Sequence, residues 1–158
     1  MTTTTTYSVS RSASIPAPAD RIYGIIADYV SGHPRILPAP WFSNLVVDEG
    51  GIGAGTRFHF DVRVAGRTQT VEGLVEEPRP GRELVETYPA TGVVTTFLVE
   101  PLPGGSTRVT FATVMPRKPG LVGLLERLAT PRFLHRVYDA ELANLARVAA
   151  ETPRGRGT

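Results

Sequence analysis

The chain has 158 residues, of which 41% are hydrophobic and 20% are charged, a composition typical of one folded domain and not of a disordered protein. Its formal net charge is only +2 and its basic residues are scattered, so the sequence excludes a dense basic surface for nucleic acid. It contains no cysteine, which excludes disulfide bonds, thiolate metal sites and a cysteine nucleophile within the chain.

Neither a membrane span nor a secretion signal is visible in the sequence. No apolar run approaches the roughly 20 residues that a helix needs to cross a bilayer. The N-terminal threonines lack the basic and apolar regions of a signal peptide. We therefore expect a cytoplasmic protein without stable membrane insertion, in which disordered tails at residues 1–6 and 152–158 flank a single domain at 7–151.

The first predicted elements are one strand and one or two short helices. From Tyr7 to Ile15 apolar residues alternate with serines, the period of a half-buried strand. A short helix is expected from Asp20 to Tyr29, where isoleucines at spacings of three and four share one face. The prolines between residues 31 and 40 leave room for at most one more short helical turn.

From Trp41 onward the hydrophobic period is two, which predicts six strands joined by short turns. The clearest strand runs from Thr56 to Val64. Its apolar residues share one face, and a slip of one residue would bury four polar or charged side chains instead. Turns this short join antiparallel neighbours. The expected strands are 41–48, 56–64, 68–77, 82–88, 93–100 and 107–115.

The last predicted element is a long helix at 120–151, with apolar residues at spacings of three and four. Thr130-Pro131 predicts a break or kink within it. A sheet with one apolar face needs a partner, and this helix is the only large one available. The expected fold class is α+β: a curved antiparallel seven-stranded sheet wrapped around the C-terminal helix, with one or two short helices after the first strand.

Several turn and packing motifs resemble those of a known superfamily. Residues 15–23, Ile-Pro-Ala-Pro-Ala-Asp-Arg-Ile-Tyr, are followed by Asp28 and are similar to its opening strand and first helix. The other motifs are the glycine turn 53–56, the proline turn 77–82, the entry to the last strand at 104–109 and the closing-helix segment 141–145. On these motifs the chain resembles, from about Tyr7 to Glu151, the START-like or Bet v 1-like superfamily (SRPBCC), in its bacterial polyketide cyclase/dehydrase and lipid-transport branch.

The resemblance implies the helix-grip fold, in which an apolar cavity remains between the bent sheet and the long helix. It also implies a hydrophobic small-molecule ligand, a lipid or a polyketide-like compound, and binding of such a molecule is the function that we expect. Taken without the resemblance, the same side chains could simply fill a dry core. The residues expected to bind the ligand are Trp41, Phe58, Phe60, Val62, Val109, Phe111, Thr113, Leu134, Tyr138 and Leu142.

The alternative function is an enzyme of the cyclase or dehydratase type. Such chemistry needs an ionisable group in the cavity. Alternation along the strands leaves open whether Glu72 and Glu86 face the cavity or the solvent. Besides these two carboxylates, the candidates for proton transfer are Tyr88, Tyr138 and His135. No catalytic signature of the cyclases can be carried over residue by residue, so the sequence does not decide between carrier and enzyme.

The remaining motifs predict neither a cofactor nor a metal. The cluster Gly50–Gly55 precedes a strand and lacks a lysine, so a hairpin turn is a better interpretation than a phosphate-binding loop. The three histidines, at positions 33, 59 and 135, show no metal-ligand spacing. We expect His59 to lie in solvent, whereas His33 and His135 could approach the mouth of a cavity.

A third possibility is an interaction role, since some START-like proteins act as chaperone cofactors. The segment Leu121–Leu125 is apolar on nearly all sides. It could contact a membrane surface or a second subunit, and a homodimer is therefore one prediction. A hinge over the entrance to the cavity, bracketed by Gly120 and Pro131, is an equally good interpretation of the segment.

Overall fold

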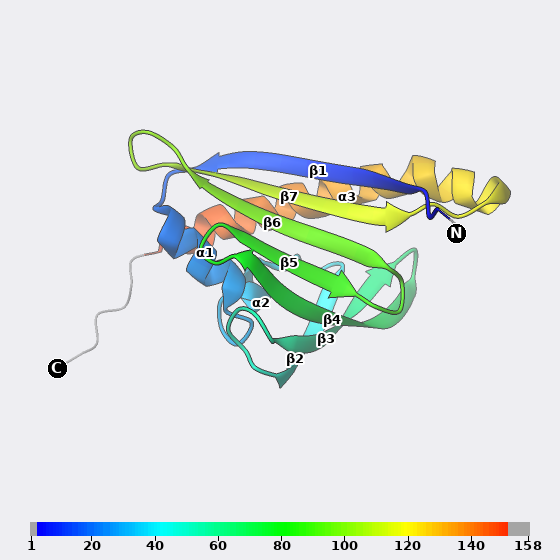
Figure 1. Cartoon of the computed structure of the whole chain (residues 1–158), viewed down its shortest axis with the longest axis horizontal. Helices are drawn as coiled ribbons and strands as arrows, with labels where there is room; N and C mark the ends of the chain where they lie inside the picture. Colours follow the sequence, from blue (N-terminus) through cyan, green and yellow to red (C-terminus); the bar gives the residue numbers. More distant parts are fainter. Residues whose placement is uncertain (1–2, 152–158) are drawn as a thin grey trace.

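The computed structural model describes residues 3–151 and, of these, all side chains except those of residues 122, 124, 125, 127 and 128. The predicted C-terminal tail, 152–158, lies outside the described residues. The elements, in chain order (Figure 1), are β1 (Thr6–Ile15), α1 (Ala19–Ala27), α2 (His33–Ile36), β2 (Phe42–Glu49), β3 (Arg57–Val64), β4 (Arg67–Arg79), β5 (Glu83–Tyr88), β6 (Val93–Pro101), β7 (Thr107–Pro116) and α3 (Gly120–Ala149).

The seven strands form one antiparallel sheet in the order β1-β7-β6-β5-β4-β3-β2, with β1 and β2 at its edges. Every strand from β2 to β6 pairs with the next one along the chain, which is the result expected from short turns. The long helix α3 runs behind this curved sheet, and α1 and α2 lie at the end reached by its C-terminal half (Figure 1). The predicted α+β helix-grip architecture is confirmed.

The core lies where α1 and the C-terminal half of α3 meet the central strands. Apolar side chains at helical spacing on α3 pack there against inward-facing residues of β6 and β7. Burying apolar surface stabilises the fold by about 25 cal/mol per Å². The largest fully buried side chains are Ile15, Ile22, Ile26, Tyr29, Ile36, Phe58, Leu84, Val99, Val109, Phe111, Val137 and Leu145.

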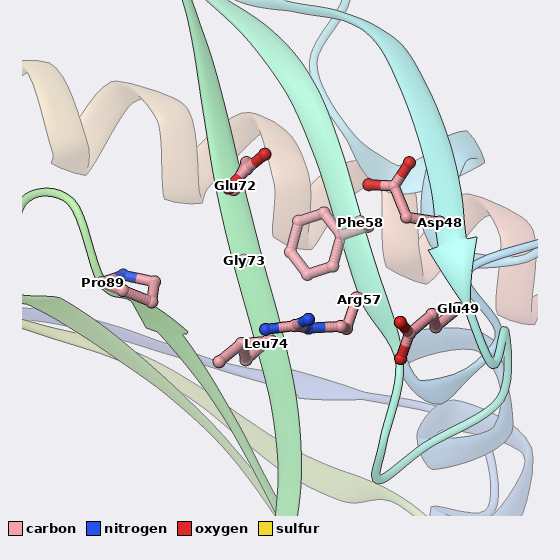
Figure 2. Close-up of a pocket in the computed structure, with 8 residues that line it drawn as sticks. All are labelled: Asp48, Glu49, Arg57, Phe58, Glu72, Gly73, Leu74 and Pro89. Carbon is pink, nitrogen blue, oxygen red and sulfur yellow. The ribbon is translucent and has the colours of Figure 1, made fainter.

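The predicted alternation of β3 is present, and it explains a glycine on the neighbouring strand. Phe58 and Phe60 are both buried, whereas the charged residues between and beside them face outward. The ring of Phe58 lies over Gly73 of β4 (Figure 2). A Cβ atom on Gly73 would lie 2.4 Å from Cζ of Phe58, so a side chain at this position would displace the ring.

Three elements differ from the sequence prediction, two in where they end and one in its continuity. β4 continues to Arg79 through Pro78, and an irregular register between Glu76 and Arg79 accommodates this proline. α1 ends at Ala27 because Asp28 begins a turn, in which its Oδ1 accepts hydrogen bonds from two following backbone N–H groups. α3 continues through Pro131 as one helix, so the predicted break is absent.

β4 and β5 pair over only part of their length. Their register begins at Leu74↔Thr87 and ends at Arg79↔Glu83. The first half of β4, from Arg67 to Gly73, pairs with β3 but with no residue of β5 in the described chain. The β3–β4 and β5–β6 hairpins therefore separate toward their tips.

Candidate functional site

A cavity of about 410 Å³ lies between the sheet and α3. Its walls come from β3 to β7, from the middle of α3, and from α2 and the beginning of β2. Side chains on both sides of the separation between β4 and β5 line it, Val71 on one side and Tyr88 and Thr91 on the other. Since Thr91 and Val64 line the cavity and are also exposed, the cavity reaches the surface near the hairpin tips.

Five of the ten predicted ligand-binding residues line this cavity: Phe60, Val62, Thr113, Leu134 and Tyr138. Their contact with a ligand stays a prediction.

The other five do not line the cavity. Four of them, Phe58, Val109, Phe111 and Leu142, are buried in the core around it. Trp41 is half-buried and packs edge-on against Phe133, which does line the cavity. The predicted ligand-binding residues therefore divide into a packed group near α1 and a second group, nearer the hairpin tips, that lines the cavity.

Glu86 of β5 is the centre of a buried polar cluster. Its side chain lines the cavity and the residue is 3% exposed. Oε1 accepts a hydrogen bond of 2.5 Å from the hydroxyl of Tyr29, and Oε2 accepts one of 2.5 Å from the hydroxyl of Tyr88. Burial, followed by the charge of Glu86, raises the pKa of both tyrosines, so they stay protonated donors.

His33 completes this cluster from α2. Its Nδ1 lies 2.7 Å from the backbone oxygen of Ile26 and must donate, because a carbonyl oxygen can only accept. This contact assigns the proton to Nδ1 and leaves Nε2 directed at Glu86, 3.6 Å from Oε1. The ring also stacks on Tyr29 at a centroid distance of 4.4 Å. His33 thus lies at the buried end of the cavity, beside Glu86, and not at its mouth as the sequence suggested.

Glu141 of α3 is a second buried carboxyl at the cavity, and it is not among the predicted site residues. It is 4% exposed, and no described residue forms a hydrogen bond with its carboxyl group. Burial, and secondly the charge of Glu86, raise the pKa of Glu141 well above its ordinary value. The signal that could have found it is helical spacing, since Glu141 lies four residues after Val137 and four before Leu145, both buried.

Hydroxyl groups form a third polar feature on the cavity wall. The Oγ1 atoms of Thr95 and Thr113 are 2.8 Å apart across β6 and β7. Thr113 also forms a hydrogen bond with the hydroxyl of Tyr138 on α3. Burial, and then the nearby Glu141, raise the pKa of Tyr138, which therefore remains a neutral hydroxyl. This chain of hydroxyls links the sheet to the helix beside the carboxyls.

The other sequence candidates lie elsewhere. Glu72 is exposed and lines a smaller pocket of about 210 Å³ outside the main cavity, where the carboxylates of β2 and Arg57 of β3 also lie (Figure 2). His59 is partly exposed, and its hydrogen bond with Asp48, 2.8 Å long, raises the pKa of its ring. His135 is half-exposed on α3 and does not line the cavity.

The cavity wall combines apolar side chains with uncharged polar groups and two carboxyls. Among the described residues that line it, two are carboxylic acids and none is lysine or arginine.

Within the described part of the chain, no group of three or more potential metal ligands occurs. No helix among the described residues has the length and hydropathy needed to cross a membrane.

Comparisons with known proteins place the chain in a family. The family model described as polyketide cyclase/dehydrase and lipid transport matches residues 6–150. No curated protein matches the chain.

Solved structures share its fold. The KanY protein is 26% identical at a TM-score of 0.81, over 93% of this chain and 99% of that one. The Zhui aromatase/cyclase from Streptomyces sp. R1128 is 21% identical at a TM-score of 0.74, over 97% and 99%. A START superfamily protein from Mycobacterium smegmatis is 18% identical at a TM-score of 0.69, over 89% and 98%. The chain belongs to the polyketide cyclase/dehydrase and lipid transport family, within the START/Bet v 1 (SRPBCC) superfamily.

Proposed function

We propose that the chain binds an apolar small molecule, a lipid or a polyketide-like compound, in the cavity between the sheet and α3. The polar group of this ligand would lie at the buried end, against Glu86 and Glu141. One observation carries the proposal: a cavity of about 410 Å³ reaches the surface at one end and has two buried carboxyls in its wall. The family and its structural neighbours, some of which are cyclases, support a ligand-binding domain.

The size and lining of the cavity support this function. Small-molecule sites are mostly apolar clefts of about 300–1,000 Å³ with a few polar groups that orient the ligand. Phe60, Val62 and Leu134 supply apolar surface here, and Glu86 and Tyr138 supply polar atoms. A dry core, the alternative considered from the sequence, would leave no space of this size between these side chains.

A tryptophan in place of Leu134 is expected to fill the cavity and to weaken binding at least tenfold. Leu134 is half-buried and lines the cavity from α3, so the larger ring occupies ligand volume without creating a void. Binding of N-phenyl-1-naphthylamine, an uncharged apolar fluorophore, measures the effect, and circular dichroism verifies the fold. Val46→Trp adds a similar volume at an exposed position of β2 and serves as the control. Equal probe affinity in the two variants would contradict the proposal.

A second candidate function is acid–base catalysis of the cyclase or dehydratase type, which the unequal environments of the two carboxyls favour. Glu86 accepts hydrogen bonds from two tyrosines, whereas burial and the charge of Glu86 raise the pKa of Glu141, which receives no hydrogen bond from a described residue. Two neighbouring carboxyls in unequal environments are suited to act as base and acid. In a dehydration, Glu86 would remove the proton next to a ketone while Glu141 protonates the departing hydroxyl. Water then leaves and a conjugated double bond forms.

Turnover of an aryl β-hydroxy ketone tests this candidate. The product enone absorbs in the ultraviolet, so its formation can be followed directly. We expect Glu86→Gln and Glu141→Gln each to lower the rate about 100-fold or more, the usual contribution of a positioned acid or base. Glu72→Gln, in the smaller outer pocket, is the control and should leave the rate unchanged. A wild-type protein that binds the ketone but never forms the enone would be a carrier and not this enzyme.

A further inference from the structure

The cavity has an unbalanced set of charges. Glu86 and Glu141 are 3% and 4% exposed, and both line it. No lysine or arginine is among the described lining residues, and His33 is the one basic side chain found there. Buried carboxylates are ordinarily paired with cations or fully hydrogen-bonded, because desolvating an ion costs several kcal/mol. The wall therefore holds more buried acid than its own basic groups balance.

The two carboxyls differ in how they are satisfied. Glu86 receives the hydroxyls of Tyr29 and Tyr88 and faces Nε2 of His33. Glu141 receives neither a hydrogen bond nor an ion pair from any described residue, although it is almost entirely buried and lines the cavity. Its oxygens are thus available to a molecule inside the cavity. The partner that Glu141 lacks in the protein is one that a ligand can supply.

The chemistry of the wall discriminates among ligand polar groups. An anionic ligand would bring a further negative charge to a wall that holds two carboxyls and, among its described residues, no lysine or arginine, which is unfavourable. A cation would be attracted to both, and it would also lie near aromatic rings, since Phe60, Tyr88 and Phe133 line the same cavity. Cations gain from contact with aromatic faces, the more so where water is excluded.

We propose that the ligand is an apolar molecule that carries a protonated amine, with its ammonium group between Glu86 and Glu141 and its hydrocarbon part along the aromatic wall. This inference rests on the proposed binding function and adds the charge of the ligand to it.

Binding of such a ligand releases a proton. Burial and the charge of Glu86 raise the pKa of Glu141, so Glu141 keeps its proton to a higher pH than an exposed carboxyl does. An adjacent ammonium favours the carboxylate form, which expels this proton. The other groups that face the carboxyl pair are His33 of α2, Tyr88 of β5, Tyr138 of α3 and Tyr29. The pKa of each of the three tyrosines is raised, so they do not titrate near neutrality.

Three naphthalene probes of similar shape test the charge preference: 1-naphthylmethylamine, 1-naphthalenemethanol and 1-naphthoate. Isothermal titration calorimetry at pH 7 gives their affinities, and titrations in two buffers of different ionisation enthalpy count the protons released. We expect the amine to bind at least tenfold more tightly than the alcohol, with release of up to one proton, and the carboxylate to bind most weakly. Glu141→Gln should remove the proton release and most of the preference, whereas Glu72→Gln, exposed and outside the cavity, should change neither.

The outcomes separate this inference from the proposed function. Equal affinity for amine and alcohol, or an unchanged preference in Glu141→Gln, would overturn the inference and leave apolar binding intact. Tighter binding of the alcohol would identify Glu141 as a hydrogen-bond donor to a neutral ligand and would also overturn it. If none of the three probes and no uncharged apolar fluorophore binds to the folded protein, the proposed function itself is wrong.

Discussion

Phe111→Ala is expected to lower the free energy of unfolding by about 3–5 kcal/mol, the usual cost of truncating a fully buried phenylalanine. Phe111 has no exposed surface. Its ring centroid lies 4.8 Å from that of Phe97 and 5.8 Å from that of Tyr138, both in edge-to-face geometry. Alanine would remove these contacts and leave a void that the surrounding strands and helix cannot close.

Urea unfolding followed by circular dichroism measures this effect. Val114→Ala, at an exposed position of the same strand, is the control and should change the free energy of unfolding by less than about 0.5 kcal/mol. A loss below 1 kcal/mol for Phe111→Ala would mean that its ring borders existing empty space. The division between a packed core at Phe111 and an open cavity at Thr113 would then be wrong.

The second large effect concerns Glu141, whose replacement by glutamine is expected to stabilise the protein increasingly as the pH rises. Burial, and then the charge of Glu86, raise the native pKa of Glu141 above its ordinary value of 4.5. A group with a raised native pKa contributes stability that is fully present below the unfolded pKa. That contribution is lost as the pH rises through the native pKa, by about 1.4 kcal/mol for each unit between the two values. Glutamine has no such proton to lose.

Thermal or urea unfolding of wild type and Glu141→Gln between pH 5 and pH 9 checks this expectation. Taking the difference between the two proteins at each pH cancels the other titrating groups to first order. The free energy of unfolding of the variant should rise relative to that of the wild type as the pH approaches 9. Glu72→Gln alters an exposed carboxylate and should show a small difference that varies little with pH. A difference for Glu141→Gln that is flat over this range, or that falls, would show that its carboxyl ionises as readily in the folded as in the unfolded state.

Much of the fold is predictable because its strands have one apolar face. In β3, polar and charged residues alternate with Phe58 and Phe60, which face the interior. This alternation fixes both the strand and its register. Short glycine and proline turns then dictate antiparallel neighbours. Pro131 is a misleading signal, because a helix that is supported by tertiary contacts can continue through a proline despite the lost hydrogen bond.

The division between core and cavity is not predictable in the same way. Phe111 and Thr113 lie on the same face of β7, and alternation assigns both of them to the inside. Only the distance between sheet and helix at each point decides that the first is packed and the second lines a space. That distance depends on the curvature of the whole sheet, which no short sequence window contains.

The polar cluster combines residues that are remote in sequence. The sequence identifies Glu86, Tyr88 and Tyr138 as candidates, and the structure brings all three to the cavity. The hydrogen bond between Tyr29 and Glu86 joins residues 57 positions apart, so no local pattern predicts it. Glu141 is different, since helical spacing places it on the buried face of α3, although charged residues ordinarily face solvent.

The early end of the ladder between β4 and β5 affects how a bulky molecule could pass. Beyond Leu74↔Thr87 the two hairpins share no register pairs, so moving their tips apart bends the backbone and leaves the existing strand pairing intact. In a sheet paired along its full length, a comparable opening would break several backbone hydrogen bonds in succession. Passage between these two hairpins therefore depends on how easily their backbones bend and on the size of the side chains at their tips.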